Sequence, residues 1–146
     1  MSADLATLRH TFGDLLRTHV TAAQDVFDEE PDDLGAASPI LVLSRVGRAR
    51  PRLSMRGNQT IARIALHCYY AASQGEAGYT AADSADVVDA VAQQIDTVVE
   101  AHQVDRAGGW EAIAYDGESV IEFGIFNADG IPRFRERVNL TFTVFA

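Results

Sequence analysis

The chain has 146 residues, with 12 arginines, no lysine, and 21 aspartates and glutamates, which give a formal net charge of −9. This length and an apolar content of 47% suit one folded domain spanning residues 1–146. The missing lysine excludes Schiff-base chemistry and the phosphate-binding lysine of a Walker loop. The acidic charge disfavours broad nucleic-acid binding, and a single cysteine excludes a disulfide framework.

No segment resembles a membrane span or a targeting signal. The longest aliphatic run, Ile40–Leu43, is far shorter than the roughly 20 residues that cross a bilayer. The N-terminus has no basic stretch before an apolar one, so we expect no signal peptide and synthesis in a cytoplasm.

The first 35 residues predict one helix and one acidic loop. Apolar residues recur at helical spacing from Leu5, and this pattern predicts a helix that ends between Thr18 and Thr21. Val26-Phe27 fits either a short strand or a packed loop. The following residues, 28–33, form what we call the acidic loop.

Two strands and a long connection are predicted next. Residues 39–46 contain a short apolar run typical of a buried strand. Residues 47–58 are bracketed by glycines and rich in arginine; we call them the arginine hairpin. Residues 60–72 alternate, with apolar even positions and with Arg63, His67 and Tyr69 on the opposite face.

The second half predicts a helix and a strand meander. A helix is expected from Thr80 to about Gln103, with valines and Ile95 on one side and carboxylates on the other. Strands are expected within 110–115, 118–126 and 131–145, with Asp116-Gly117 as a tight turn. The predicted fold class is α+β: a mainly antiparallel sheet of four to five strands with both helices on one face.

The residues that usually carry chemistry form no recognisable catalytic motif. His67 and Cys68 are adjacent, but neighbouring strand residues point to opposite faces, so a thiol–imidazole pair is disfavoured and Cys68 is interpreted as a core residue. His10 and Asp14 fit a solvent-facing helix pair. The acidic loop lacks the alternating ligands and central glycine of a calcium loop. We therefore predict no enzyme, no cofactor and no metal site.

The distribution of arginine is the one unusual feature of the chain. Arg45 and four arginines of the hairpin lie within twelve positions of an otherwise acidic sequence. One hypothesis is that the arginine hairpin of one subunit docks against the acidic loop of its neighbour, a head-to-tail contact that closes into a ring when the rotation permits. A solvated hairpin tip and a nucleic-acid contact are the alternatives. The predicted interface residues are Arg48, Arg50, Arg52 and Arg56, then Asp28, Glu29, Glu30, Asp32 and Asp33, and Arg133, Arg135 and Arg137 on the polar face of the last strand.

Taken in order over about residues 4–146, these features resemble the tail terminator proteins of siphophage-like tailed phages. The features are the helix Leu5–Leu16, Val26-Phe27-Asp28, the strand Pro39–Val42, the arginine hairpin, the strand Ile61–Leu66, the helix Val87–Val99 and the ending Gly130–Phe142.

The resemblance implies a structural virion protein of the tail or neck, assembled in the host cytoplasm. Its copies would form a ring, expected to be a hexamer, that caps the head-proximal end of the tail tube and stops tube polymerisation. The implied partners are further copies, the tail tube protein and the head-tail connector or head-completion protein. DNA would pass through the lumen without specific binding, and no membrane would be involved.

Two alternatives remain at this stage. The first is another phage neck or head-completion protein. The second, of a different class, is a small α+β ligand-binding domain or enzyme, which would need a pocket around Arg63, His67 and Tyr69.

Overall fold

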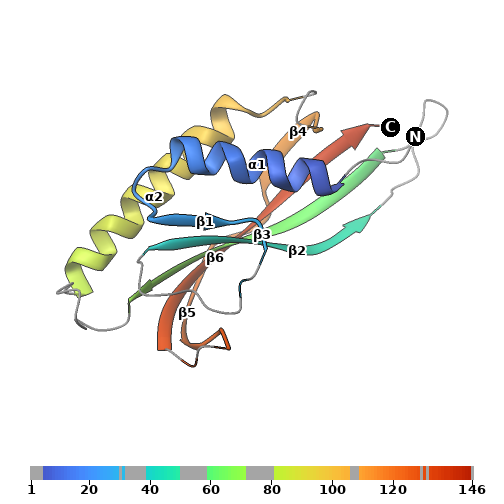
Figure 1. The fold of residues 1–146 in the computed structure, drawn as a ribbon. Coiled ribbons are helices and arrows are strands. Elements are labelled where there is room, and N and C mark those ends of the chain that lie inside the picture. Colours follow the sequence, from blue (N-terminus) through green and yellow to red (C-terminus); the bar gives the residue numbers. More distant parts are fainter. Residues whose placement is uncertain are drawn as a thin grey trace.

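The computed structural model describes residues 5–29, 31, 39–49, 59–71, 81–105, 109–128, 130 and 132–145. They form two helices that lie on one face of a six-stranded sheet (Figure 1). The elements are α1 (Leu5–His19), β1 (Asp25–Phe27), β2 (Ile40–Ala49), β3 (Gln59–Ala71), α2 (Ala81–Ala101), β4 (Ala112–Tyr115), β5 (Val120–Ile125) and β6 (Pro132–Phe145). The predicted α+β class and the placement of both helices are confirmed. Six strands exceed the expected four to five because Asp25–Phe27 joins the sheet as β1.

The sheet is built around the pairing of its two longest strands. Its order is β1-β2-β3-β6-β4, with β5 also paired to β6, and the pairing of β1 with β2 is the parallel one. The antiparallel β3–β6 register runs from Gln59 opposite Phe145 to Ala71 opposite Arg133. The whole length of β3 is therefore hydrogen-bonded to β6.

The predicted meander is wrong, because β4 and β5 do not pair with each other. Both pair with the same edge of β6: Tyr115 at the end of β4 lies opposite Leu140, and Val120 at the start of β5 lies opposite Arg137. Residues 116–119 thus face only two residues of β6 and form a wide bulge. Gly117 adopts a φ of 81° there, which explains why Asp116-Gly117 has the sequence of a turn.

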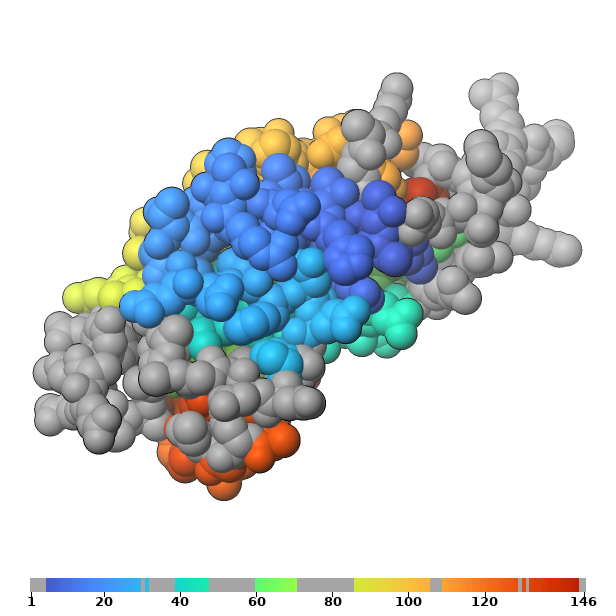
Figure 2. Space-filling model, viewed as in Figure 1, coloured from blue at the N-terminus to red at the C-terminus, as the bar shows by residue number. Residues whose placement is uncertain are grey.

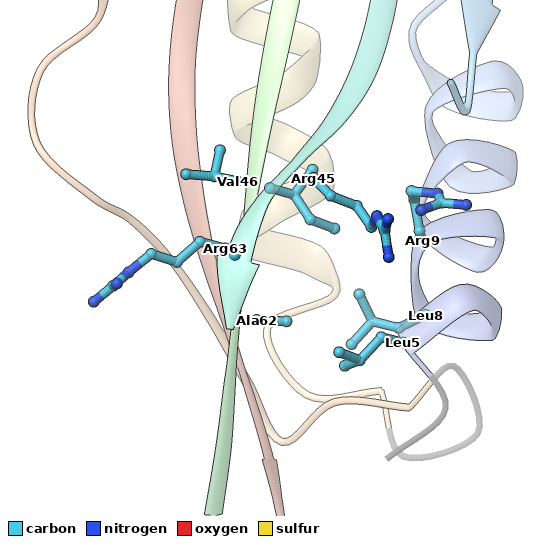
Figure 3. Close-up of a pocket in the computed structure, with 9 residues that line it drawn as sticks. Leu5, Leu8, Arg9, Arg45, Val46, Ala62 and Arg63 are labelled. Carbon is cyan, nitrogen blue, oxygen red and sulfur yellow. The ribbon is translucent and has the colours of Figure 1, made fainter. Parts of the chain in front are cut away.

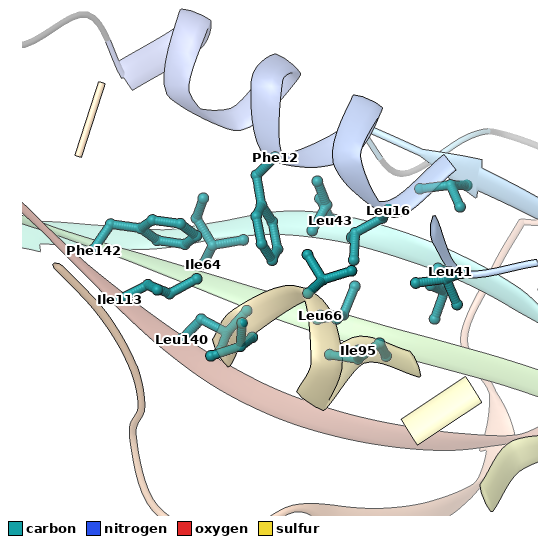
Figure 4. Close-up of a cluster of buried hydrophobic side chains, with 14 of the residues drawn as sticks. Phe12, Leu16, Leu41, Leu43, Ile64, Leu66, Ile95, Ile113, Leu140 and Phe142 are labelled. Carbon is teal, nitrogen blue, oxygen red and sulfur yellow. The ribbon is translucent and has the colours of Figure 1, made fainter. Parts of the chain in front are cut away.

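The hydrophobic core lies between the helices and the even-numbered positions of the two long strands (Figure 4). Side chains at one parity share a face of a sheet, so β3 and β6 contribute alternate residues such as Ile64, Leu66, Leu140 and Phe142. Phe12 of α1 makes edge-to-face contacts with Phe142, at 5.1 Å between ring centroids, and with Trp110, at 6.1 Å. The other core residues are Leu8, Leu16, Val20, Val26, Leu41, Leu43, Ala62, Cys68, Val88, Val91, Ile95, Val98, Val99 and Ile113.

The face of the sheet without helices carries a small apolar cluster of its own. Ile40, Val42 and Tyr69 are buried there, with Phe27 and Phe126 packed against them. The expected polar face of β3 is therefore apolar at Tyr69. Alternation fails at this position because the segment after β5 brings the Phe126 ring within 6.0 Å of the Tyr69 ring.

The strand β2 continues beyond the expected end of its apolar run. It reaches Ala49, and its register with β3 shifts between Arg45 and Gly47, so a bulge lies where the arginine hairpin was expected to begin. Residues 50–58 lie outside the described residues.

Candidate interaction surface

Three arginines of β6 lie in a row on the face of the sheet that has no helices. Arg133, Arg135 and Arg137 occupy alternate positions, opposite in parity to the core residues of the same strand. On β3 their directly paired partners are Ala71, Tyr69 and His67, respectively. The polar face predicted for the last strand is confirmed, and its role as an interface remains a prediction.

Neighbouring side chains hold these arginines close to the sheet. Arg135 donates to the Glu122 carboxylate at 3.1 Å, and its guanidinium carbon lies 4.0 Å from the centre of the Phe126 ring. The Nε atoms of Arg135 and Arg137 are buried without a hydrogen-bond partner. Arg133 is 6% exposed. The guanidinium groups are therefore restricted in mobility, and Arg133 and Arg135 expose little of their surface to a partner.

His67 lies beside this row on β3, directly opposite Arg137. It is 8% exposed, and its Nδ1 is buried without a hydrogen-bond partner. Burial, followed by the positive charges of Arg135 and Arg137, lowers the pKa of His67 to about 4, and the Glu122 carboxylate opposes this shift. At neutral pH the imidazole is uncharged, so it adds no repulsion to the arginines.

Cys68 takes no part in this surface. Its side chain belongs to the core on the helix side, whereas His67 lies on the opposite face, so the predicted separation of the two is confirmed. Burial raises the pKa of the Cys68 thiol to about 12, so the reactive thiolate is suppressed.

The described carboxylates of the acidic loop are engaged within the chain. Asp28, whose side chain is 17% exposed, accepts hydrogen bonds from Arg17 at 2.7 Å and lies 2.8 Å from His10 Nδ1. Glu29 pairs with Arg9 at 3.1 Å and is 74% exposed. His10 therefore pairs with Asp28 and not with Asp14 as expected. The Asp28 carboxylate is thus already paired within the chain, which weakens the hypothesis that the acidic loop binds a neighbour's arginine hairpin.

The close approach of Asp28 to α1 depends on a glycine. A Cβ atom at Gly13 would overlap Asp28 Oδ1. Any larger residue at this helical position would displace the carboxylate from Arg17 and His10.

Most of the predicted hairpin and acidic-loop residues lie outside the described residues. These are Arg50, Arg52, Arg56, Glu30, Asp32 and Asp33. Arg48 belongs to β2, where its backbone pairs with Ala62.

A cavity lies between α1 and the ends of β2 and β3 (Figure 3), and it was not predicted from the sequence. It has a volume of about 390 Å³, with Leu5 and Leu8 of the helix on one side and Ala62 on the other. Arg9 and Arg45 point toward each other at its rim, and Arg63 points away from them. Because its contributors come from three separate elements, only the folded chain brings them together.

The exposed apolar side of β5 was also missed. Ile121, Phe123 and Ile125 are 61%, 59% and 64% exposed. No other described strand pairs with the outer edge of β5. The alternation of these residues with Glu122 and Gly124 was visible in the sequence. A meander, however, would have paired β5 with strands on both sides, so the edge position of β5 was not predicted.

The three residues that the ligand-binding alternative would need in one pocket do not converge in the described part of the structure. The rings of His67 and Tyr69 lie 6.0 Å apart, whereas Arg63 is exposed and lies 3.9 Å from the Asp116 carboxylate. Within the described part of the chain, no three His, Cys, Asp or Glu side chains are grouped to hold a metal ion. Among the same residues, no helix is long and apolar enough to cross a membrane.

Comparison with known proteins assigns no family to this chain. No protein-family model matches it, and no curated protein matches it at a significant level.

Removing the buried histidine is expected to change the pH dependence of stability. The unfolded chain takes up a proton on His67 near pH 6.5, whereas the folded chain does so near pH 4. The contribution of the neutral His67 ring to the free energy of unfolding is therefore complete above pH 6.5 and is lost as the pH falls toward 4. Between these values, unfolding takes up roughly one proton at this residue. Urea unfolding of His67→Gln should show a shallower loss over this interval than the wild type. Equal slopes would contradict a neutral buried imidazole.

The contact between Asp28 and Gly13 predicts a strongly non-additive pair of substitutions. Asp28→Ala should lower the free energy of unfolding by about 1–2 kcal/mol, through loss of two partly exposed charged contacts. Gly13→Ala should also destabilise the wild type, because the new methyl group displaces the carboxylate. In the Asp28→Ala background the same change should stabilise by up to about 1 kcal/mol, the usual helix preference for alanine over glycine. Additive effects in a double-mutant cycle would contradict this arrangement.

Proposed function

We propose that this protein is a structural assembly protein, a ring-forming tail terminator of a phage or a closely similar neck protein. The exposed apolar side of β5 carries the proposal. Edge strands with large exposed apolar residues are sites of pairing with other chains, and isolated monomers usually protect them with charge. On β5 three such residues alternate along one side of a strand whose outer edge is paired with no other strand among the described residues.

The arginine row gives the proposal a second surface with different chemistry. It lies on the face without helices, while the apolar side of β5 faces the helix side of the sheet, as shown by the packing of Phe123 on Phe134 at 5.1 Å. A subunit with two different contact surfaces suits head-to-tail assembly and contacts with other partners. The order of elements resembles that of the tail terminators and supports the assignment to a phage. The proposal therefore includes a hexameric ring, with the tail tube protein and the head connector as partners.

Figure 2 shows where these surfaces lie in the molecule. The end of the sheet that holds β5 and the start of β6 stands out beyond α1. A partner could reach it without displacing either helix.

Native mass measurement of an edge variant tests the proposal. The wild type should form a discrete species of about 95 kDa, six subunits of 15.8 kDa, alone or with tail tube protein. Ile121→Lys/Ile125→Lys should remain folded and return the mass to one subunit, because charge on an edge strand opposes pairing.

The matched control is Val46→Lys/Val104→Lys, which places the same charges on valines that are each 59% exposed and lie away from β5. It should retain the wild-type mass. A wild type that stays monomeric with or without tube protein would contradict the proposed function and favour the ligand-binding alternative.

A further inference from the structure

A second cavity lies along one side of α2, between the helix and residues of β3, β4 and β6, and forms a groove of about 340 Å³. Its floor is apolar, with Leu66 and Val138 from the sheet and Val91, Ala92 and Ile95 from the helix. We call it the α2 groove. It lies apart from the arginine row, because Leu66 and Val138 point to the helix side of the sheet.

The rim of the α2 groove is acidic. Asp96 and Glu136 line it, and Tyr115 donates a hydrogen bond to Asp96 across one end. The helix has no lysine or arginine along its whole length, and its exposed carboxylates also include Asp86, Asp89 and Glu100. Asp89 lies close enough to Tyr70 to help raise the pKa of that phenol, after burial and Glu136. An occupant of this groove should therefore combine apolar and cationic side chains.

The groove continues onto the exposed apolar side of β5. Ile121 lies directly opposite Glu136, which lines the groove, and Phe123 packs on Phe134. Phe134 stacks in turn on Tyr70, with 5.3 Å between ring centroids. An apolar segment lying in the groove would thus also cover residues that are otherwise exposed at the sheet edge.

One segment of this chain has the chemistry that the groove requires. Residues 50–58 read Arg-Pro-Arg-Leu-Ser-Met-Arg-Gly-Asn, so the apolar Leu53 and Met55 are flanked by Arg52 and Arg56. This segment joins β2 to β3 at the end of the sheet where Gln59 lies opposite Phe145. The groove lies over the middle of β6, where Val138 is seven residues from Phe145. Seven strand residues span roughly 23 Å, so the occupant that fits this groove is the same segment of a second copy.

We propose that residues 50–58 of one copy dock in the α2 groove of the next, with Leu53 and Met55 on its apolar floor and the arginines on its acidic rim. This inference rests on the proposed assembly function and names the contact that drives it. It replaces the acidic loop as acceptor, since Asp28 already pairs with Arg17 and His10. The contact joins two different surfaces, so it leaves one donor and one acceptor free in every open chain.

Mixing two complementary variants tests this geometry. The donor-defective variant is Arg50→Glu/Arg52→Glu/Arg56→Glu, and the acceptor-defective variant is Asp89→Arg/Glu136→Arg. Each alone should be monomeric at 15.8 kDa. Mixed in equal amounts they should form only a two-subunit complex, because one intact donor and one intact acceptor remain. Circular dichroism and thermal unfolding establish that both are folded.

The control is Asp25→Arg/Glu29→Arg, which changes the charge by the same amount at two exposed carboxylates away from α2 and β5. It should keep the wild-type mass; dissociation by this variant and not by Asp89→Arg/Glu136→Arg would overturn the inference in favour of the acidic loop. Wild-type mass in the folded donor- or acceptor-defective variant would also overturn it, while leaving the assembly function intact.

A wild type that never assembles would contradict the proposed function, and a synthetic peptide of residues 47–59 then tests the docking alone. Binding that is at least tenfold weaker to Asp89→Arg/Glu136→Arg than to the wild-type protein would support the groove as acceptor. Equal binding to both would overturn it.

Discussion

The pairing of β6 with β3 is the constraint on which the rest of the structure depends. It runs the whole length of β3, from Gln59 opposite Phe145 to Ala71 opposite Arg133. Because alternate residues point to opposite faces, this one register places Leu140 and Phe142 in the core and Arg135 and Arg137 on the other face. A slip of one residue would exchange the two sets, burying the arginines beneath the helices. The large penalty for burying unpaired charge therefore reinforces the register that the apolar residues favour.

The same strand separates the surfaces that we assign to assembly. Its outer edge carries β4 and β5 in succession, interrupted by the bulge at residues 116–119. The bulge lies beside the α2 groove, where Gly117 and Ser119 contribute to the lining. Charge is segregated in the same way: α2 presents carboxylates without cations, whereas cations are concentrated in the arginine row and in residues 48–56. Segregated charge in one subunit favours contacts between unlike surfaces of different copies.

Local patterns predicted the helices and the long strands because their periodicity is strong and is reinforced by burial on one side. The alternation in β3 placed Ala62, Ile64, Leu66 and Cys68 on the core face, as the structure has them. The arrangement of β4 and β5 could not be predicted from turn residues, because glycine with positive φ serves a bulge as well as a hairpin.

The interaction surfaces were predicted only in part, for the same reason. The arginine row follows directly from alternation in β6. The α2 groove requires side chains from α2, β3 and β6 to meet, and the pairing of Asp28 with Arg17 requires contact between segments 11 residues apart across a helix end. Neither has a sequence signature of its own. The distribution of charge along the sequence suggested a contact between hairpin and acidic loop, whereas the pairing of Asp28 with Arg17 and His10 favours α2 as the acceptor.

Cysteine crosslinking between copies tests the central claim of a head-to-tail contact most directly. The native Cys68 lines the α2 groove, so all variants also carry Cys68→Ala to remove a competing thiol. Leu53→Cys/Ala92→Cys, oxidised under assembly conditions, should yield a ladder of covalent multimers that ends at the size of the closed ring, and neither single variant should crosslink. Assembled protein that forms no ladder, or single variants that crosslink into dimers, would contradict the account.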